Sequence, residues 1–305
     1  MERVAVIGAG LMGHGIAQVF AVAGHPVAIT DESADALASV HERVRANLER
    51  SGGDPAAADL IELRDSVEAA LEDADFVVEA APENLELKQA LFARLSRAAS
   101  PDTILATNTS VISIGEIAAG ADDPARVVGT HFWNPPHLIP LVEVTQAEHT
   151  RLDVVERTMV ILAGAGKTPI HVKHDIPGFV GNRLQHALWR EAIALVDAGV
   201  CDAKSVDDVI KQSFGLRLSV LGPLENADLV GLDLTLAIHE YVLPHIDRTP
   251  GPSPLLRRLV EQGDLGMKTG RGLREWTDDE AQAVRERLFD HLVALARPEQ
   301  MKGAT

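Results

Sequence analysis

The sequence is poor in cysteine, in aromatic residues and in positive charge. Cys201 is the single cysteine among 305 residues, which excludes an internal disulfide and a thiolate metal cluster, and we expect a reducing cytoplasm and no metal. Only 28 basic residues stand against 45 acidic ones, a net charge of -17, so no overall basic field attracts nucleic acid or an anionic membrane. We expect neither partner. No apolar run reaches the roughly 18 residues that could span a bilayer, and we expect no targeting segment.

A glycine-rich turn follows the first apolar stretch of the chain. Residues 4–7 have the pattern of a buried strand, and helical periodicity runs over residues 15–23. The G-x-G-x-x-G turn between them consists of Gly8, Ala9, Gly10, Leu11, Met12 and Gly13. Its first glycine permits the tight turn, its second lets the backbone approach a pyrophosphate, and its third allows close packing of helix on strand. Strand, glycine turn and helix in this order predict a dinucleotide-binding unit.

Asp31 indicates which dinucleotide to expect. It ends a second predicted strand, residues 27–30, where a carboxylate can accept hydrogen bonds from the adenosine ribose hydroxyls. A carboxylate also repels a 2′-phosphate, and neither Glu32 nor Ser33 offers a positive charge to hold one. The sequence therefore favours NAD over NADP. Asp31 can at the same time start a turn or cap the helix that we predict from Ala34.

Polar residues also follow later strands, at the point where each strand ends. The alternation of strands and helices continues through predicted strands over residues 73–80 and 103–107. In open parallel sheets ligands bind beyond the carboxyl ends of the strands, so Glu79 and Asn108 should border the same crevice as the glycine turn. Ser110 is also a candidate N-cap of the next predicted helix.

His131 and Glu143 are the candidate catalytic pair. A strand predicted over residues 126–130 delivers His131 at its end, and another over 141–144 contains Glu143. Oxidation of a secondary alcohol sends a hydride to nicotinamide while a proton leaves the oxygen, and neutral imidazole suits that proton at physiological pH. Glu143 would fix the imidazole tautomer. Taken alone, the histidine could bond to backbone and the glutamate could be a surface acid. Beside a dinucleotide site, the pair predicts a dehydrogenase.

Two other dehydrogenase designs do not fit the residue content. The single tyrosine, Tyr241, is followed four positions later by His245, so the Tyr-x-x-x-Lys dyad of short-chain dehydrogenases is absent. A zinc alcohol dehydrogenase would be hard to build with one cysteine.

Strand signals nearly cease after residue 172, and helical periodicity takes over. The predicted helices cover residues 184–198, 203–214, 232–243 and 278–296, separated by breaks at Gly222-Pro223 and at the 250–254 prolines. The sequence therefore predicts an α/β fold with two domains. A Rossmann-type doubly wound sheet domain covers residues 1–177, and an all-α domain covers residues 178–305. A cleft between them would bury a substrate.

The chain resembles the 3-hydroxyacyl-CoA dehydrogenase family over nearly its whole length. The matching motifs are Gly8 to Gly13, Val77-Val78-Glu79-Ala80, Glu83-Asn84-Leu85, Asn108-Thr109-Ser110, His131 to Pro136, Leu141-Val142-Glu143-Val144, Pro177-Gly178-Phe179, Asn182-Arg183-Leu184 and Gly222-Pro223-Leu224-Glu225. The resemblance implies the family's two-domain fold, a reversible NAD-dependent oxidation of a 3-hydroxyl group, and a homodimer formed through the helical domain.

The resemblance also implies roles for individual residues. His131 matches the family's catalytic base and Glu143 its carboxylate partner. Ser110 and Asn182 match catalytic-site residues that contact the substrate near its hydroxyl and carbonyl. We expect substrate contacts from Ser110, Asn134 and Asn182. Outside the glycine turn, the expected cofactor-binding residues are Asp31, Glu79, Asn84, Asn108 and Lys268.

Two departures from the family pattern concern the substrate. Members that act on acyl-CoA usually carry a longer, lysine-rich arm after the ribose-binding acid, whereas residues 32–65 hold eight acids, four arginines and no lysine. The phosphates of CoA usually recruit Lys or Arg. Arg43, Arg45 and Arg50 could supply this charge, or could form a solvated helix face. Residues 272–274, Gly-Leu-Arg, lack the aromatic side chains that the family places after this glycine.

The segment 134–141 resembles relatives that oxidise free hydroxy acids, namely the gulonate dehydrogenase and lambda-crystallin branch and the carnitine dehydrogenases. We therefore favour a free hydroxy acid as the substrate. An L-3-hydroxyacyl-CoA thioester such as 3-hydroxybutyryl-CoA is the alternative. A NAD-binding or structural protein without catalysis is a further alternative, against which the presence of all four catalytic-site residues argues.

Overall fold

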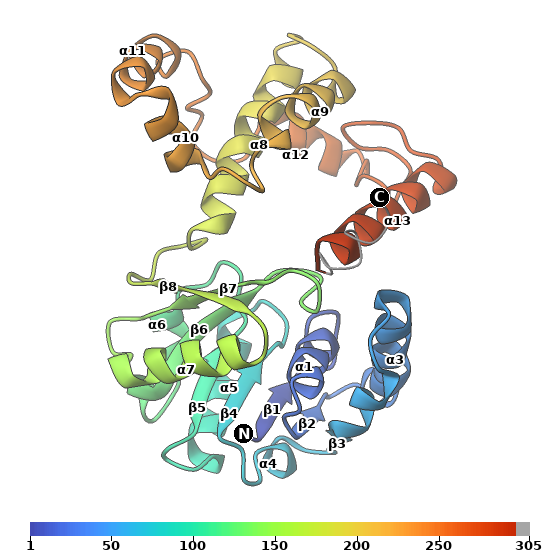
Figure 1. The fold of residues 1–305 in the computed structure, drawn as a ribbon, viewed down its shortest axis with the longest axis vertical. Coiled ribbons are helices and arrows are strands. Elements are labelled where there is room, and N and C mark those ends of the chain that lie inside the picture. Colours follow the sequence, from blue (N-terminus) through green and yellow to red (C-terminus); the bar gives the residue numbers. More distant parts are fainter. Residues whose placement is uncertain (297–305) are drawn as a thin grey trace. The chain divides into compact units, whose positions relative to one another are not determined.

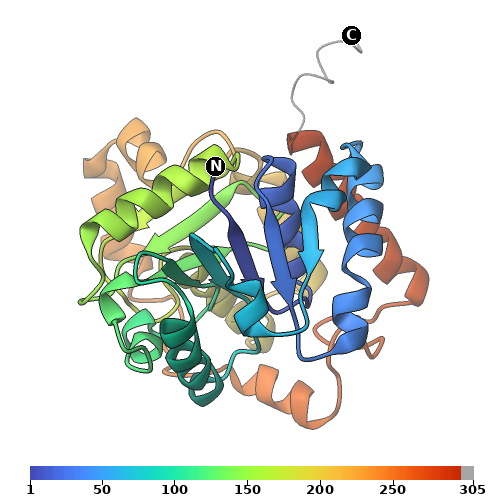
Figure 2. The same ribbon diagram turned by 90° about the horizontal axis from the view of Figure 1, so that it is seen from below.

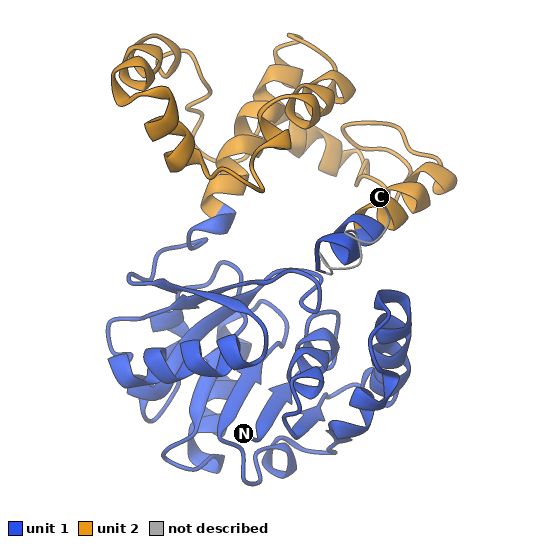
Figure 3. Ribbon diagram, in the orientation of Figure 1, with its two compact units in different colours: residues 1–182, 289–305 blue, residues 183–288 orange. Residues whose placement is uncertain are grey.

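The chain folds into two compact units. The computed structural model describes residues 1–296, and Figure 3 colours the two units separately. The first unit contains residues 1–182 and the end of the last helix from Phe289, and the second contains residues 183–288. Contacts thus divide the chain after Asn182, five residues later than the predicted boundary at 177, because residues 180–182 are hydrogen-bonded to the first unit.

An eight-stranded sheet forms the centre of the first unit (Figure 1). Its strands are β1 (Val4–Ile7), β2 (Val27–Thr30), β3 (Ile61–Leu63), β4 (Phe76–Glu79), β5 (Ile104–Thr107), β6 (Val127–Phe132), β7 (Leu141–Thr145) and β8 (Thr168–Val172). They lie in the order β3-β2-β1-β4-β5-β6-β7-β8, and every neighbouring pair is parallel except β6 with β7. The parallel order brings the ends of β1, β2, β4 and β5 to one edge, where the sequence predicted the crevice.

Helices cover both faces of this sheet, as Figure 2 shows from below. Strands β1, β4, β5 and β6 are buried along their whole length, which explains their nearly continuous apolar sequences. One apolar core contains Phe20, Val44 and Leu162, from the helices α1 (Gly13–Val22), α3 (Val40–Ser51) and α7 (Leu152–Gly164). The other contains Phe92 and Ile117, from α5 (Leu85–Ala98) and α6 (Ile114–Ala118), together with residues of α4 (Val67–Ala70). The first unit is a doubly wound α/β domain, as predicted.

Short elements complete the first unit. They are α2 (Ala34–Ala38) and the 3-10 turns η1 (Pro55–Leu60) and η2 (Pro124–Arg126). The described residues include no helix long and apolar enough to cross a membrane.

The second unit is all helical, as predicted, and it buries little of its surface. It contains most of α8 (Gly181–Asp197), then α9 (Ala203–Gln212), η3 (Phe214–Leu216), α10 (Pro223–Val230), α11 (Leu232–Val242), α12 (Pro254–Glu261) and most of α13 (Asp278–Ala296). Among residues 183–288 only Val206 and Ala281 are buried. Pro223 and Pro254, which the sequence analysis treated as breaks, each begin a helix instead. Proline is tolerated in the first helical turn because its missing N–H would have no helical partner there.

Candidate active site

His131 and Glu143 face each other across two antiparallel strands. The register of β6 with β7 places the two residues directly opposite, so their side chains lie on the same face of the sheet. His131 Nδ1 lies 2.8 Å from Glu143 Oε2, and the two side chains are only 5% and 2% exposed. The sequence analysis placed His131 at the end of its strand, whereas it lies within β6, which extends to Phe132.

The second carboxylate oxygen of Glu143 is bound by the backbone. Glu143 Oε1 accepts hydrogen bonds of 2.9 Å from the N–H groups of Val180 and Gly181, at the start of α8. Burial acts to raise the pKa of Glu143, but the hydrogen bonds from His131, Gly181 and Val180 outweigh it and hold the pKa below its ordinary value of 4.5. Glu143 is therefore ionised at neutral pH and accepts from Nδ1–H, which leaves the lone pair of neutral imidazole on Nε2.

Aromatic rings flank the imidazole. The ring centroids of Trp133 and Phe179 lie 5.3 and 5.6 Å from that of His131. Within residues 1–296 no hydrogen bond engages His131 Nε2. The pair thus presents one oriented nitrogen that can take up a proton. The described residues contain no group of three or more His, Cys, Asp or Glu side chains that could hold a metal ion.

Asn182 connects Ser110 to this pair. It follows Gly181 in α8, and its Nδ2 donates a 3.0 Å hydrogen bond to the backbone oxygen of Ser110, in the loop after β5. The four predicted catalytic residues are therefore joined by contiguous contacts. Ser110 does not cap the next helix, because Ser113 takes that position and accepts from the helix backbone.

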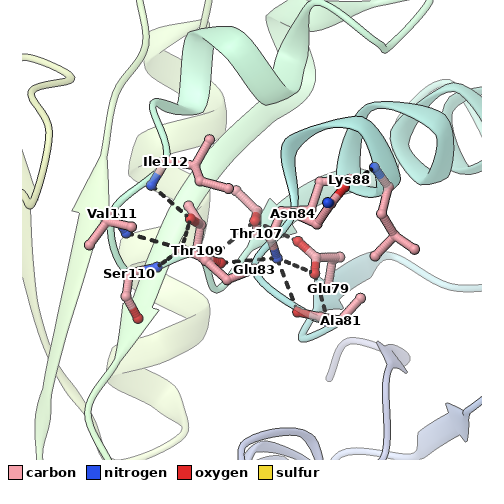
Figure 4. Close-up of polar contacts among 11 residues, drawn as sticks. Glu79, Ala81, Glu83, Asn84, Lys88, Thr107, Thr109, Ser110, Val111 and Ile112 are labelled. Atoms are coloured by element: carbon pink, nitrogen blue, oxygen red, sulfur yellow. Dashed lines mark hydrogen bonds and ion pairs between the residues drawn. The ribbon is translucent and has the colours of Figure 1, made fainter. Parts of the chain in front are cut away.

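A buried ion pair lies beside the loop after β5 (Figure 4). Lys88 Nζ is 2.6 Å from Glu79 Oε1, and the two side chains are 1% and 0% exposed. Glu79 also accepts from Thr107 Oγ1 at 2.6 Å and from the N–H of Ala81 at 2.7 Å. The side chain of Glu79 is thus fully buried and engaged within the protein, and its cofactor contact stays a prediction. Its carboxylate is used within the protein and holds the ends of β4 and β5 together.

Glu83 organises the same loop (Figure 4). Its Oε1 accepts from Thr109 Oγ1 at 2.6 Å and from the N–H groups of Ser110 and Val111 at 2.9 and 3.1 Å. Its Oε2 lies 3.5 Å from Lys88 Nζ. Burial acts to raise the pKa of Glu83, but the hydrogen bond from Thr109, the Lys88 charge and the backbone donors together lower it. The sequence analysis gave Glu83 and Lys88 no role. The signal for Glu83 was its place in the matching motif Glu83-Asn84-Leu85, and Lys88 follows that motif within α5.

The glycine turn has the geometry that a dinucleotide needs. Gly8 has φ +107°, and a Cβ added there would lie 2.7 Å from the carbonyl oxygen of Ala80. A Cβ on Gly13 would overlap the Gly8 carbonyl, so the helix packs directly on the turn. An added Cβ on Gly10, in contrast, has nothing within 4 Å. The open space beside Gly10 is where a pyrophosphate can approach the backbone, and these residues fit NAD.

Asp31 has one of the two roles that the sequence left open, since it forms a turn. Its Oδ2 accepts from the N–H of Ala9 at 2.5 Å, and its Oδ1 accepts from the N–H of Ser33 at 2.7 Å. The helix cap itself is Ser33, whose Oγ accepts from Ala36. Asp31 thus forms the turn after β2 and holds it against the glycine turn. Each carboxylate oxygen keeps a second lone pair for a ribose hydroxyl.

The remaining predicted residues lie in different settings. Asn108 Oδ1 accepts from the N–H of Phe132 at 2.8 Å and joins the end of β5 to β6. Asn84 is the N-cap of α5, with its side chain bound to that helix. Asn134 is exposed and precedes a cis peptide bond to the next proline. Lys268 is exposed in the second unit and is not among the residues that the first unit brings together.

Comparisons with known proteins agree with this geometry. Residues 3–176 match the sequence profile of the 3-hydroxyacyl-CoA dehydrogenase NAD-binding domain, and residues 178–276 match that of the family's C-terminal domain. A probable 3-hydroxybutyryl-CoA dehydrogenase of Bacillus subtilis is 38% identical over 91% of this chain and 98% of its own length. An L-carnitine dehydrogenase of Streptomyces coelicolor is 39% identical over 83% of this chain and 79% of its own length.

One similar crystal structure is that of 5-formyl-3-hydroxy-2-methylpyridine 4-carboxylic acid 5-dehydrogenase, described as an NAD+-dependent dismutase. It superposes with a TM-score of 0.90 at 30% identity, over 97% of this chain and 98% of that one. With both profiles matched in order over most of the chain, the protein belongs to the 3-hydroxyacyl-CoA dehydrogenase family, NAD-dependent oxidoreductases that act on a CH–OH group.

Proposed function

We propose that this protein reversibly oxidises a secondary 3-hydroxyl group to a ketone, with His131 as the general base and Glu143 as the group that orients it. The observation that carries the proposal is the buried 2.8 Å hydrogen bond between them, which leaves His131 Nε2 available. NAD, when bound, accepts the hydride. The protein's own task is to take the hydroxyl proton on Nε2 and to stabilise the imidazolium that results.

Ser110 and Asn182 are the residues that we propose to contact the substrate beside its hydroxyl. The support is their connection: Asn182 bonds to the backbone of Ser110, and it follows Gly181, which bonds to Glu143. Asn134, exposed two residues after β6, is proposed as a third substrate contact. We propose that a substrate bound at these groups presents its hydroxyl to the free nitrogen of His131, as proton transfer requires.

For the cofactor, we propose that the pyrophosphate lies against the glycine turn at Gly10 and that Asp31 binds the adenosine ribose. The open space at Gly10 and the spare acceptor sites of Asp31 support this placement. Asn108, at the end of β5, would border the nicotinamide half, and Glu83 and Lys88 would hold that edge in place. The proposed role of Lys268 rests on the family resemblance alone.

We further propose a free hydroxy acid as the substrate, because three of the four arginines of the short arm, all except Arg50, are bound to carbonyl or carboxylate oxygens. Arg43 donates to the carbonyl oxygens of Ala9 and Ala36, at 2.6 and 2.9 Å. Arg45 pairs with Asp59 at 2.7 Å, and Arg64 bonds to Glu62, its neighbour in β3. Cations already bound in this way do not readily serve the phosphates of CoA. The similarity to the pyridine carboxylic acid dehydrogenase over nearly the full chain points the same way.

A CoA thioester is the second candidate, favoured by the similarity to the probable 3-hydroxybutyryl-CoA dehydrogenase. The two are separated by measuring NAD reduction with 3-hydroxybutyryl-CoA, free 3-hydroxybutyrate, gulonate, carnitine and aromatic hydroxymethyl acids at equal concentrations. We expect the highest kcat/KM with a free acid. A kcat/KM at least about tenfold higher for the thioester would reverse the choice of substrate but leave the catalytic pair in place.

We propose that the protein acts as a homodimer through its helical unit, in the cytoplasm. Within residues 183–288 side chains such as Val220, Leu224 and Leu229 are 85%, 81% and 74% exposed, and only two residues are buried. Exposed apolar surface on this scale usually marks an interface. Sedimentation equilibrium of the full chain tests this: a monomer at micromolar concentration would refute the dimer. The single cysteine favours a reducing compartment.

A further inference from the structure

The chain segment that carries the start of α8 is fastened to the first unit at both ends. At one end, Asp175 Oδ2 accepts a 2.6 Å hydrogen bond from Ser113 Oγ. At the other end, Asn182 bonds to the loop after β5 at 3.0 Å. Between them lie the two N–H groups that bind Glu143. This segment is therefore part of the surroundings of the catalytic pair, although it lies 38 residues from Glu143 in sequence.

Phe179 turns the chain so that these N–H groups reach Glu143. Its backbone φ is +48°, in the left-handed region that side-chain-bearing residues rarely adopt, and it follows Gly178 with φ +77°. Such a conformation costs on the order of 1–3 kcal/mol and persists only when its surroundings enforce it. The Phe179 ring is fully buried, in the same core cluster as Ile114, and lies 5.6 Å from His131. Burial of this ring enforces the turn.

Gly181 brings the first turn of α8 against Trp133. A Cβ added to Gly181 would overlap Trp133 Cζ2 and would lie 3.2 Å from its Cη2. The indole itself is 5.3 Å from His131, centroid to centroid. A residue larger than glycine would therefore push the helix start away from the indole, and the N–H groups would move away from Glu143 Oε1.

We propose that Phe179 and Gly181 are positioning residues for the catalytic base. They place the first turn of α8 so that its N–H groups hold Glu143 ionised and aimed at His131. The unpaired N–H groups of a first helical turn carry partial positive charge, which favours a carboxylate at this place. The inference rests on the proposed role of His131. It adds that the base depends on two residues, Phe179 and Gly181, that themselves supply no group to the reaction.

The test is a set of three variants assayed with the best substrate of the panel. Gly181→Ala should lower kcat by about 100-fold, the loss expected for a displacement of about 1 Å, and should leave the Kd for NAD within about twofold. Adding Trp133→Phe removes the atoms that collide, and the double variant should recover at least about tenfold of the lost kcat. Gly164→Ala is the matched control, since its Cβ meets nothing within 4 Å, and should match the wild type.

A measurement without substrate distinguishes positioning from general damage. In protein labelled with ¹⁵N-histidine, the Nδ1–H signal of His131 should appear far downfield, because it is bonded to a carboxylate. Gly181→Ala should broaden or shift this signal upfield, the double variant should restore it, and Gly164→Ala should not change it. A folded Gly181→Ala protein with wild-type kcat and an unchanged signal would overturn the inference.

Phe179 supplies the second variant pair. Phe179→Leu keeps an apolar side chain and should retain kcat within about threefold, whereas Phe179→Ala should lose about tenfold or more and shift the His131 signal. Equal behaviour of the two variants would refute a positioning role for the ring. His131→Ala is measured alongside: retained turnover there would overturn the proposed function itself. An inactive His131→Ala with fully active Gly181→Ala and Phe179→Ala would overturn the positioning role alone.

Discussion

Replacing Glu143 with glutamine should inactivate the base without changing the size of the side chain. In the wild type Oε1 accepts from two N–H groups, those of Val180 and Gly181, and Oε2 accepts from His131. A glutamine has one oxygen and one NH2 group. The two backbone donors require the oxygen, so the NH2 group must face His131 Nδ1. A donor at that position forces the imidazole to carry its proton on Nε2.

This tautomer cannot accept the hydroxyl proton of a substrate, and the magnitude follows from that. General-base catalysis contributes about 10²- to 10⁴-fold, and loss of the correct tautomer in comparable histidine–carboxylate pairs removes nearly all of it. We therefore expect kcat for Glu143→Gln to fall by roughly 10³-fold. The Kd for NAD should stay within about twofold, because the glycine turn follows β1 and Asp31 follows β2, whereas Glu143 lies in β7.

Stopped-flow measurement of NADH absorbance and fluorescence titration with NAD give the two quantities. Histidine ¹⁵N spectra report the tautomer of His131 directly. A variant that keeps more than about a tenth of the wild-type kcat while carrying its proton on Nε2 would refute the reasoning. So would a variant in which the proton stays on Nδ1, since the backbone donors would then not dictate the orientation of the amide.

Stability should respond to pH in a way that depends on the same carboxylate. The folded-state pKa of Glu143 lies below 4.5, so the unfolded chain binds a proton here more readily than the folded one. The stabilisation that ionised Glu143 gives the folded state is complete above about pH 4.5. It is lost as the pH falls through the lowered pKa that this carboxyl has in the folded protein. Urea unfolding of wild type and Glu143→Gln should thus show a stability difference that shrinks below pH 4.5. A constant difference from pH 7 to pH 3.5 would contradict this sign.

Three further predictions concern the base, the glycine turn and the buried ion pair. His131→Ala should lower turnover by about 100-fold or more with nearly unchanged NAD affinity, and a normal rate would end the proposed mechanism. Gly10→Ala should keep its melting temperature within a few degrees yet bind NAD at least about tenfold more weakly, whereas Gly8→Ala, with φ +107°, should lose about 1–3 kcal/mol of stability. If Gly10→Ala and Gly8→Ala lowered the melting temperature equally, the different roles given to these two glycines would be wrong. Lys88→Met leaves the carboxylate of Glu79 buried without its partner and should cost about 3–5 kcal/mol in urea unfolding, and adding Glu79→Gln should recover much of the loss. Full stability of the single variant would show that Glu79 takes up a proton instead.

The fold was predictable where local pattern and tertiary setting agree. The strands at residues 4–7 and 27–30 and the helix at 278–296 have the predicted bounds. The apolar sequences of the two strands correspond to burial, whereas the helix buries only Ala281 and was predictable from its helical periodicity alone. Strand β3 was missed, since only Ile61 of its three residues is buried and no alternation is visible. Helices α10 and α12 were missed because proline begins each of them, and proline was interpreted as a break.

The site was predictable where chemistry is local in sequence. His131 and Glu143 could be predicted because an imidazole and a carboxylate occur on neighbouring predicted strands of a dinucleotide-binding domain. Glu79 has the same position at a strand end, yet its carboxylate is buried by Lys88, nine residues later. A strand-end acid facing the crevice and one facing a buried amine look alike in sequence. Glu83 was missed for the opposite reason, since an acid before a helix usually has only a capping role.

What local pattern could not supply is the support of the base. Ser110, Glu143 and Gly181 belong to three segments. The hydrogen bonds that join these segments and His131 span 72 residues from Asn182 to Ser110, 38 from Gly181 to Glu143, and 12 from Glu143 to His131. Each segment has an ordinary local explanation: a loop serine, an acid in a strand, a glycine at a helix start. Their joint function appears only in the structure, where different segments bind the two oxygens of the Glu143 carboxylate. Because Oε1 is held by the backbone and Oε2 by the imidazole, a movement of the α8 start would loosen Glu143 and with it the orientation of His131. Substitutions far from the reacting atoms should therefore alter kcat rather than cofactor affinity.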